Sequence, residues 1–498
     1  MARSALRIVQ ISAIAVVLVA LPYTVFDLDR FLIPKELVLH LTAVVGGLLA
    51  FGAMRRLEMT RVDLLLTAYI VLGALSALFA TNHWLGLRGI SVSASGVLIF
   101  WIARAINEAD LQRPLLAGIA IAIVIAAGTA LLQAYGLRID FFAMTRVPGG
   151  TLGNRNFIAH VAAFGLPVCM LVAMSSTIAL PGVALVTAAL VLTRSRAAWL
   201  ACAVMFVVFL FGLIIAREWR SLRRLLLIVI GAAIGAGAAL VLPNALHWRS
   251  DNPYLESMHS VANYEEGSGH GRLVQYGRSL LMSVRHPLFG VGPGNWPVVY
   301  PSHVPRSDPS LNPSGAGMTY NPWPSSDWMA FVSERGLAAA VLLALAMIGI
   351  ATATDIGQPG VAVLHWTRIA ILVAVVVEGM FDAVLLLAVP TLLVWAALGA
   401  LHPRQPVTRP FRTLVLSGVL LVSLVGAAYS AAEVFSMNVM VHRGTRTALE
   451  QASAIDPGNY RLHMRLAQGG RNRCAHATAA HDLFPTSAEA ARLSRGCR

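Results

Sequence analysis

Arginines beside glycine and asparagine are the residues of this chain best suited to bind a charged group. Arg146 and Arg155 flank the stretch Val-Pro-Gly-Gly-Thr-Leu-Gly-Asn, and Arg194 and Arg196 lie two positions apart before a long apolar run. The planar guanidinium presents paired N–H donors that match phosphate oxygens. An anion site is therefore predicted, with further candidate cations at Lys35, Arg88, Arg272 and Arg278. The alternative is that each arginine separately reaches lipid head-group phosphates.

Two glycine-rich turns could add backbone N–H donors to such a site. One precedes an Asn-Arg-Asn stretch, and the other has the alternating pattern Gly-Val-Gly-Pro-Gly-Asn. Amides in glycine turns can approach a phosphate closely, but the same composition is typical of ordinary turns. The residues concerned are Asn154, Asn156, Gly290, Gly292, Gly294 and Asn295.

Two acids and the histidines complete the candidates. Glu378 and Asp382 stand four apart in an apolar segment, so a helix would place both on one face. Acids inside a membrane are costly and usually functional, although pairing with an arginine of another helix explains them equally well. The 14 histidines show no His-x-x-x-His spacing and the cysteines no Cys-x-x-Cys spacing. No metal site is expected, and metal-independent chemistry without a cofactor is predicted.

The composition indicates what kind of element holds these residues. Of 498 residues, 57% are apolar and only 12% are charged, and the mean hydropathy is +0.70. One soluble domain cannot bury that much apolar surface, and disordered chains have low hydrophobicity. Four cysteines exclude a disulfide scaffold. The net charge of +14 does not indicate nucleic-acid binding, because basic residues of membrane proteins collect in loops.

Apolar runs of about 20 residues, the length that crosses a bilayer, predict an all-α polytopic membrane protein with 12 or 13 spans. The first run follows Arg3 and Arg7 and lacks a small-residue cleavage site, so it is expected to be an uncleaved anchor. The predicted spans are 6–26, 34–54, 62–80, 86–106, 113–135, 156–174, 177–193, 197–216, 225–242, 328–353, 364–382, 384–401 and 412–436.

Basic residues predict the orientation of these spans. Arginines occur in the connections near residues 55–61, 104–113, 217–224 and 404–412, which all lie on one side if the spans alternate. By the positive-inside rule this side is cytoplasmic, as is the N-terminus. Thirteen spans would place the long connection and the C-terminal tail outside, whereas a miscounted hairpin would reverse the tail.

Four segments are expected along the chain. These are a transmembrane bundle (1–242), a large external loop with site residues (243–327), further transmembrane helices (328–436) and a helical tail (437–498). The tail resembles degenerate tetratricopeptide hairpins, and Cys474 and Cys497 could form a disulfide across the second hairpin in an oxidising compartment.

Several segments together resemble the O-antigen ligase and O-antigen polymerase superfamily, which includes lipopolysaccharide ligases, repeat-unit polymerases and protein O-oligosaccharyltransferases. The most specific is the stretch from His286 to Asn295 after an upstream Gly271-Arg272-Leu273. The other matching stretches are Pro34-Lys35-Glu36, Gly150 to Ala159, Ser195-Arg196-Ala-Ala-Trp199, Glu334-Arg-Gly336-Leu337 and Phe381-Asp382.

The resemblance implies a glycosyltransferase similar in fold to the lipid-linked-sugar transferases of the GT-C type. Such an enzyme of the bacterial inner membrane takes a glycan from undecaprenyl pyrophosphate on the periplasmic face. It passes the glycan to a hydroxyl of lipid A core, a growing glycan chain or a protein. Arg196 and Arg272 match the functional arginines of the family, and cations there would stabilise the leaving pyrophosphate.

One position departs from the family pattern, because Ser325 stands where a histidine near the acceptor is expected. A serine cannot accept a proton as imidazole does near pH 7. The acceptor could be activated instead by Asp327 or by a loop histidine such as His270 or His303. Alternatively, departure of the leaving group dominates the reaction, or this member binds glycan without transferring it. A transporter or flippase of lipid-linked glycans is the remaining alternative, although the two halves show no inverted repeat.

Overall fold

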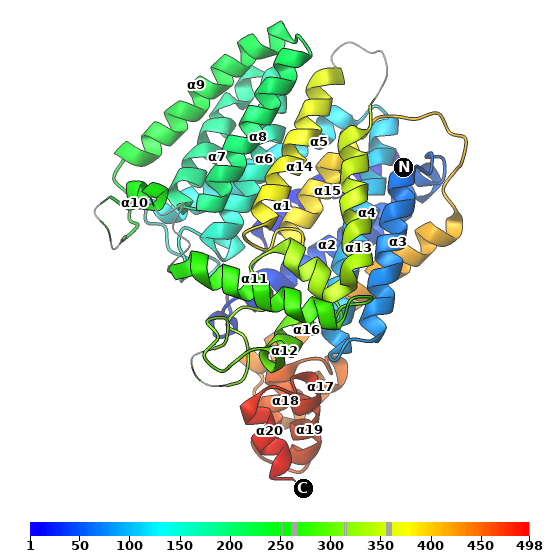
Figure 1. Ribbon diagram of the computed structural model, residues 1–498, viewed down its shortest axis with the longest axis vertical. Coiled ribbons are helices and arrows are strands. Elements are labelled where there is room, and N and C mark those ends of the chain that lie inside the picture. The colour runs from blue at the N-terminus through cyan, green and yellow to red at the C-terminus, as the bar shows by residue number, and fades with distance from the viewer. Residues whose placement is uncertain are drawn as a thin grey trace.

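The computed structural model describes residues 1–248, 250, 252–259, 267–312, 314, 316–354 and 361–497. These residues form helices joined by turns, with isolated β-bridges and no β-strand among them. Figure 1 shows the helices as one bundle, from which the C-terminal helices project at one end.

Every predicted span has a helix, but the first helix ends at Leu18 and not near residue 26 as predicted. Ten of the helices in the described residues are long and apolar enough to cross a membrane, and α7 and α15 are shorter apolar helices. The chain is therefore an all-α, multi-pass membrane protein. The bundle helices are α1 (Ala2–Leu18), α2 (Asp29–Met54), α3 (Arg61–Leu78), α4 (His83–Glu108), α5 (Gln112–Ala134), α6 (Arg155–Ser175), α7 (Leu180–Thr193), α8 (Arg196–Ile215), α9 (Trp219–Val241), α13 (Asp327–Thr352), α14 (Val361–Gly379), α15 (Ala388–Ala400) and α16 (Thr413–His442).

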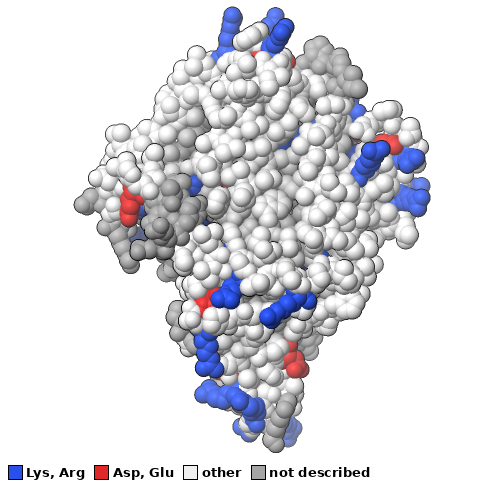
Figure 2. Space-filling view, viewed as in Figure 1, with Lys and Arg blue, Asp and Glu red and all other residues white. Residues whose placement is uncertain are grey.

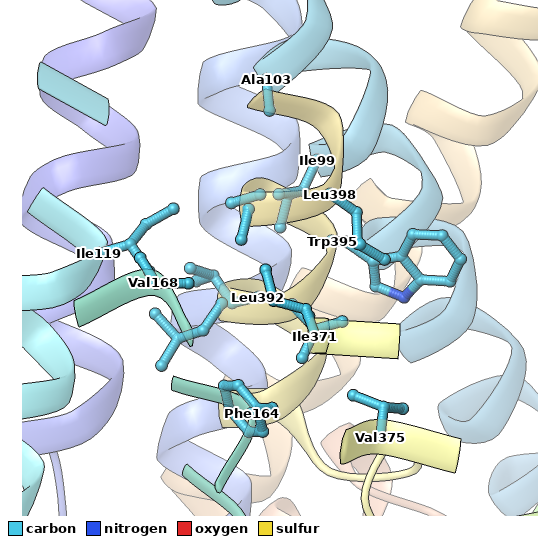
Figure 3. Packing of buried hydrophobic residues seen from close by; sticks show 14 of the residues in the cluster. Ile99, Ala103, Ile119, Phe164, Val168, Ile371, Val375, Leu392, Trp395 and Leu398 are labelled. Atoms are coloured by element: carbon cyan, nitrogen blue, oxygen red, sulfur yellow. The ribbon is translucent and has the colours of Figure 1, made fainter. Parts of the chain in front are cut away.

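Helix α15 is the centre of the bundle, and all of its residues are buried. It packs against α4 and against α2, α5, α6 and α14 through apolar side chains such as Leu392 and Trp395 (Figure 3). Gly96 of α4 permits close approach, because a Cβ there would lie 2.6 Å from Cγ2 of Thr391. The prediction of a full span over 384–401 was wrong in one respect: the helix has 13 residues and is preceded by a buried turn.

The connections gather at two ends of the bundle. At the first, here called the arginine end, Arg404 pairs with Asp110 at 2.7 Å and the N–H of Arg409 donates to Oε2 of Glu58 at 2.7 Å. The second, here called the loop end, carries the connection between α9 and α13. On the face shown in Figure 2, a broad surface without charged residues lies between the charged groups. Such a band suits the apolar interior of a bilayer.

The loop end carries two further groups of helices. The long connection contains α10 (Pro253–His259), α11 (Gly267–Arg285) and α12 (Trp296–Val299), and α11 crosses the ends of the bundle helices (Figure 1). The tail contains α17 (Arg446–Ile455), α18 (Tyr460–Ala467), α19 (Arg473–Leu483) and α20 (Ala488–Arg495).

The tail packs against the long connection. The N–H of Ala488 donates to the carbonyl of Ala316 of that connection at 3.0 Å. The tail also contacts the start of α4, where Nδ2 of Asn82 donates to the carbonyl of Leu483 at 3.2 Å. Cys474 and Cys497 form a disulfide that joins α19 to the end of α20. The two segments predicted to lie on one side of the bundle therefore touch each other.

Candidate functional site

The first turn of α6 is the point around which the candidate residues gather. Asn154 caps the helix, and its Oδ1 accepts the N–H of Asn156 at 3.0 Å. The preceding glycine turn is held by Gln133, whose Oε1 accepts the N–H groups of Gly149 and Gly150 at 2.8 Å each. These two amides are occupied by a side chain of the protein itself, so their role is to set where α6 begins.

Three predicted arginines meet on one side of this turn. The charges of Arg146 and Arg194 both act on Arg155. The guanidinium groups of Arg155 and Arg194 lie over the ring of Trp248, 5.2 and 4.7 Å from its centroid. Arg194 also donates to Oγ of Ser257 at 3.0 Å and pairs with the exposed Glu256 at 3.4 Å. Arg146 is exposed. We call Arg146, Arg155 and Arg194 the arginine cluster.

An acid also contacts the side chains at the start of α6. Nδ2 of Asn156 donates to Oδ2 of Asp382 at 3.0 Å, and Nε2 of His160 lies 3.6 Å from the same oxygen. The charge of Arg272 on α11 also acts on His160. The prediction that Glu378 and Asp382 share a helix face was wrong, because α14 ends at Gly379 and Asp382 lies in the following turn.

Helix α11 is held over this acid by its own polar side chains. Tyr276 donates through its hydroxyl to the carbonyls of Ser325 at 2.7 Å and Met380 at 2.5 Å. Oε1 of Gln275 accepts the N–H of Ser325 at 2.6 Å. Arg272 stands four residues before Tyr276, so the two side chains lie on the same face of α11. The half-buried Ser325 is thus part of the same assembly.

Asp327 does not have the position predicted for a base. It is fully buried, and its Oδ1 and Oδ2 accept the N–H groups of Val384 at 3.0 Å and Leu385 at 2.8 Å. Its lone pairs are therefore directed at the turn between α14 and α15, where buried backbone N–H groups need such partners. Glu378 is equally buried, and neither of its carboxyl oxygens has a partner among the described residues.

The second glycine turn is also occupied by the protein itself. Glu334 accepts the N–H of Gly294 at 2.8 Å through Oε2 and that of Trp296 at 3.2 Å through Oε1, and its carbonyl accepts the N–H of Gly292 at 2.8 Å. Asn295 accepts the N–H of Asn82 through Oδ1 at 2.7 Å. Of the two interpretations of this turn, the contacts therefore favour an ordinary structural turn, because the amides of Gly292 and Gly294 are bonded within the protein.

Close approach explains the glycines of this turn. A Cβ on Gly290 would lie 2.4 Å from the carbonyl carbon of Glu334, and one on Gly336 would lie 2.2 Å from the carbonyl oxygen of Leu288. Gly336 also has φ +81° inside α13, which side-chain-bearing residues rarely adopt. The two family-like stretches thus form one interlocked structure between the long connection and α13.

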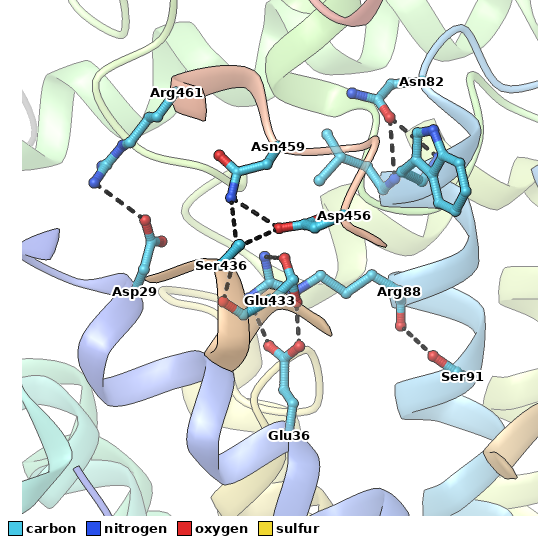
Figure 4. Close-up of polar contacts among 12 residues, drawn as sticks. Asp29, Glu36, Asn82, Arg88, Ser91, Glu433, Ser436, Asp456, Asn459 and Arg461 are labelled. Carbon is cyan, nitrogen blue, oxygen red and sulfur yellow. Dashed lines mark hydrogen bonds and ion pairs between the residues drawn. The ribbon is translucent and has the colours of Figure 1, made fainter. Parts of the chain in front are cut away.

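Two predicted anion-binding cations have structural partners instead. Arg88 donates from Nε and Nη2 to the carboxylate of Glu36 at 2.7 and 2.8 Å, and its Nη1 lies 3.9 Å from Glu433 (Figure 4). Lys35 is buried, and its ammonium donates to the carbonyl of Val19 at the end of α1. These contacts hold α1, α2, α4 and α16 together, which corrects the prediction for both cations.

The same network reaches the tail. Asp456 accepts the hydroxyl of Ser436 at 2.6 Å and Nδ2 of Asn459 at 2.8 Å, and Arg461 pairs with Asp29 at 3.4 Å (Figure 4). Polar contacts therefore dock the tail on α2 and α16.

The remaining candidates lie on the long connection and at the start of α8. Arg196 is the first residue of α8 and is half-buried, whereas Arg278 and His270 are exposed on α11. The rings of His303 and His286 lie 6.2 Å apart. Burial, with smaller effects of His303 and Arg285, lowers the pKa of His286. Within the described part of the chain, no group of three His, Cys, Asp or Glu residues could hold a metal ion.

His160 is the residue of this site that the sequence patterns missed. It follows Asn156 by four positions, so one helix face carries both side chains to Asp382. That spacing after a helix-capping asparagine was the available signal.

Residues 181–344 match the family model described as O-Antigen ligase. The matched segment runs from α7 into α13 and includes Arg194, Arg196, Arg272 and Glu334. The match confirms the resemblance to the O-antigen ligase and polymerase superfamily and supports a glycan-transfer function of that type. No curated protein matches the chain.

Proposed function

We propose that this protein transfers a glycan from an undecaprenyl-pyrophosphate donor to a hydroxyl acceptor at the loop end. We assign the loop end to the periplasmic face of the bacterial inner membrane, because the arginine-rich connections lie at the opposite end. The observation that carries the proposal is the arginine cluster. Among the described residues, Glu256 is the one acid that pairs with it. Like charges repel, so three adjacent cations favour binding of an anion.

The donor pyrophosphate would lie across the first turn of α6. Arg155 and Arg194 would bind it on one side, with Arg146 at the exposed edge, and Arg196 and Arg272 would neutralise the charge that develops as it leaves. Fixed cations in a site of low dielectric stabilise such a charge strongly. The positive end of the α6 dipole acts in the same direction.

A small cavity of about 20 Å³ lies beside this turn, between α2, α6 and the start of α15. Its lining is apolar except for Lys35, whose ammonium donates to the carbonyl of Val19. A cavity of this size does not hold an isoprene unit, so we propose that the lipid chain of the donor lies in the bilayer.

The acceptor would approach from the long connection and the tail. Both lie at the loop end and contact each other through Ala316 and Ala488. We therefore propose that the tail helps to bind the acceptor, which is a growing glycan chain, a protein or lipid A core.

The test is release of undecaprenyl pyrophosphate by the purified protein in lipid nanodiscs. The donor is an undecaprenyl-pyrophosphate oligosaccharide, without added metal, and acceptor glycans, peptides and lipid A core are each supplied. Arg272→Ala is compared with Arg220→Ala, a matched loss of an exposed arginine at the other end. We expect release with the wild type and Arg220→Ala but not with Arg272→Ala.

The products separate the alternatives. Long products identify a polymerase, and single additions identify a ligase. Donor binding without release for any acceptor would overturn the proposal in favour of a non-catalytic glycan-binding protein. Movement of intact donor across proteoliposomes, without release, would overturn it in favour of a flippase.

A further inference from the structure

Asp382 is held rigidly by three elements at the loop end. Its Oδ2 accepts Nδ2 of Asn156 at 3.0 Å, and its Oδ1 accepts the N–H of Ala383 at 2.9 Å. Its own N–H donates to the carbonyl of Glu378 at 3.0 Å, and its carbonyl accepts the N–H of Asp327 at 3.3 Å. A carboxylate fixed in this way presents a lone pair in one direction without a cost in side-chain entropy.

The side chains of Asp382 and His160 differ in their exposure to solvent. The side chain of Asp382 is 17% exposed, whereas that of His160 is 1% exposed and lies behind it. Nδ1 of His160 is buried and has no hydrogen-bond partner among the described residues. The imidazole therefore touches Asp382 through Nε2 and cannot itself reach a substrate. A solute at the loop end meets the carboxylate first.

We infer that Asp382 is the base that takes the proton of the acceptor hydroxyl, and that His160 is the residue that positions it. This inference rests on the proposed function. In the step, the acceptor oxygen bonds to the anomeric carbon while the bond from that carbon to the pyrophosphate oxygen breaks. The electron pair of the broken bond goes to the pyrophosphate, and the hydroxyl proton goes to Oδ2 of Asp382.

The surroundings favour this carboxylate over the other acids nearby. Asp327 and Glu378 are both fully buried, whereas 17% of the Asp382 side chain is exposed. The charge of Arg272 acts on His160 beside this acid, so we place the departing pyrophosphate and the base close together. Asn156 adjoins Arg155 on α6, which links the acid directly to the arginine cluster.

The experiment compares Asp382→Asn and Asp382→Glu in two measurements. The first is donor affinity, and the second is the single-turnover rate of undecaprenyl pyrophosphate release at saturating donor and acceptor. We expect Asp382→Asn to keep donor affinity and lose about 10²- to 10⁴-fold in rate, the usual contribution of a general base. Asp382→Glu keeps a base and should recover part of the rate.

Azide makes the test specific, because this nucleophile carries no proton to remove. Asp382→Asn with azide should form glycosyl azide at a rate near that of the wild type with azide. Arg272→Ala should not, since its defect lies in donor binding and in departure of the leaving group. Formation of glycosyl azide also shows that the Asp382→Asn protein is folded.

His160 is tested by a conservative pair. His160→Gln retains an amide that reaches the carboxylate, and His160→Leu does not. We expect His160→Leu to lower the rate at saturating substrate at least about tenfold without changing donor KM, and His160→Gln to recover most of it. Equal rates for the two variants would overturn the positioning role.

The outcomes separate this inference from the proposed function. No release by the wild type would overturn the proposed function itself. Release by the wild type with an unchanged rate in Asp382→Asn would overturn only the inference. Loss of donor affinity in Asp382→Asn, with no glycosyl azide, would also overturn it and make Asp382 a binding residue.

Discussion

Glu334 of α13 accepts the backbone N–H of Gly294, which precedes it by 40 residues, at 2.8 Å. The same carboxylate accepts the N–H of Trp296, so one buried acid closes the glycine turn of the long connection onto the bundle. Asn295 of the same glycine turn also accepts the N–H of Asn82 at the start of α4. A glycine-rich stretch whose composition could suit a phosphate thus joins the long connection to the bundle.

Removal of the Glu334 carboxylate should destabilise the protein. In Glu334→Ala two buried N–H groups lose their acceptor, at about 1–3 kcal/mol each. Glu334→Gln keeps one acceptor oxygen and should cost less. The free energy of unfolding in detergent micelles measures both, with the exposed Glu489→Gln as control. Full stability of Glu334→Ala combined with weaker donor binding would mean instead that the turn serves the ligand.

Asp327→Asn should act through the turn before α15. The amide keeps one acceptor oxygen and directs an NH₂ group at a backbone N–H, so we expect a loss of about 1–3 kcal/mol. Transfer should fall as well, because the N–H of Asp327 donates to the carbonyl of Asp382. Unfolding and release assays on one preparation measure the two effects. An inactive variant of unchanged stability would instead identify Asp327 as a participant in the chemistry.

Arg88 should matter for stability and not for the donor. Arg88→Met leaves Glu36 buried without its partner, which typically costs 3–5 kcal/mol. In the double variant Arg88→Met/Glu36→Met much of this loss should return, because apolar side chains often replace a buried ion pair at little cost. A double-mutant cycle of unfolding free energies measures the coupling. Reduced donor affinity in the stable double variant would restore Arg88 to the anion site.

The tail should lose stability as the pH falls. The Nδ1 atoms of His463 on α18 and His476 on α19 lie 3.0 Å apart. Burial is the main cause that lowers the pKa of each below 6.5, and for His476 the charge of His463 adds to it. A histidine whose pKa is lower in the folded state stabilises it above its unfolded pKa, and this contribution is lost as pH falls through the folded value.

Hydrogen exchange of α18 and α19 between about pH 7.5 and 5 measures this loss, since the unfolded pKa of histidine is about 6.5. Exchange, corrected for its intrinsic pH dependence, should become faster relative to α16 as the pH falls. His476→Leu removes one of the paired rings and should flatten the change. An unchanged pH response in that variant would show that the histidine pair does not control the tail.

The sequence determined the helices of the bundle, because a stretch that crosses a bilayer needs about 20 apolar residues and turn residues interrupt such stretches visibly. All thirteen predicted spans have a helix, and the capping role of Asn154 is equally local. The disulfide between Cys474 and Cys497 could also be predicted from the sequence, since the two cysteines bracket one hairpin. The largest errors in the spans were at α1, which ends at Leu18 and not near residue 26, and at α15, where burial on all sides permits a helix of 13 residues.

Residue type alone could not separate cations that bind a ligand from those that bind the protein. Lys35 and Arg88 carry the same charge as Arg155 and Arg194, yet Lys35 donates to the carbonyl of Val19 and Arg88 to the carboxylate of Glu36. The sequence could not decide between the two interpretations of the glycine turns for the same reason, because Gln133 and Glu334 reach the amides only in the folded chain.

The sequence by itself determined a membrane-embedded helical bundle, its family resemblance and the residue types able to bind a phosphate. Only the tertiary structure decided which of them act together, and it brought His160 to Asp382 across 222 positions of chain. The reason is physical. In an interior of low dielectric every buried polar group needs a partner, and packing of distant helices determines which partner comes within hydrogen-bonding distance.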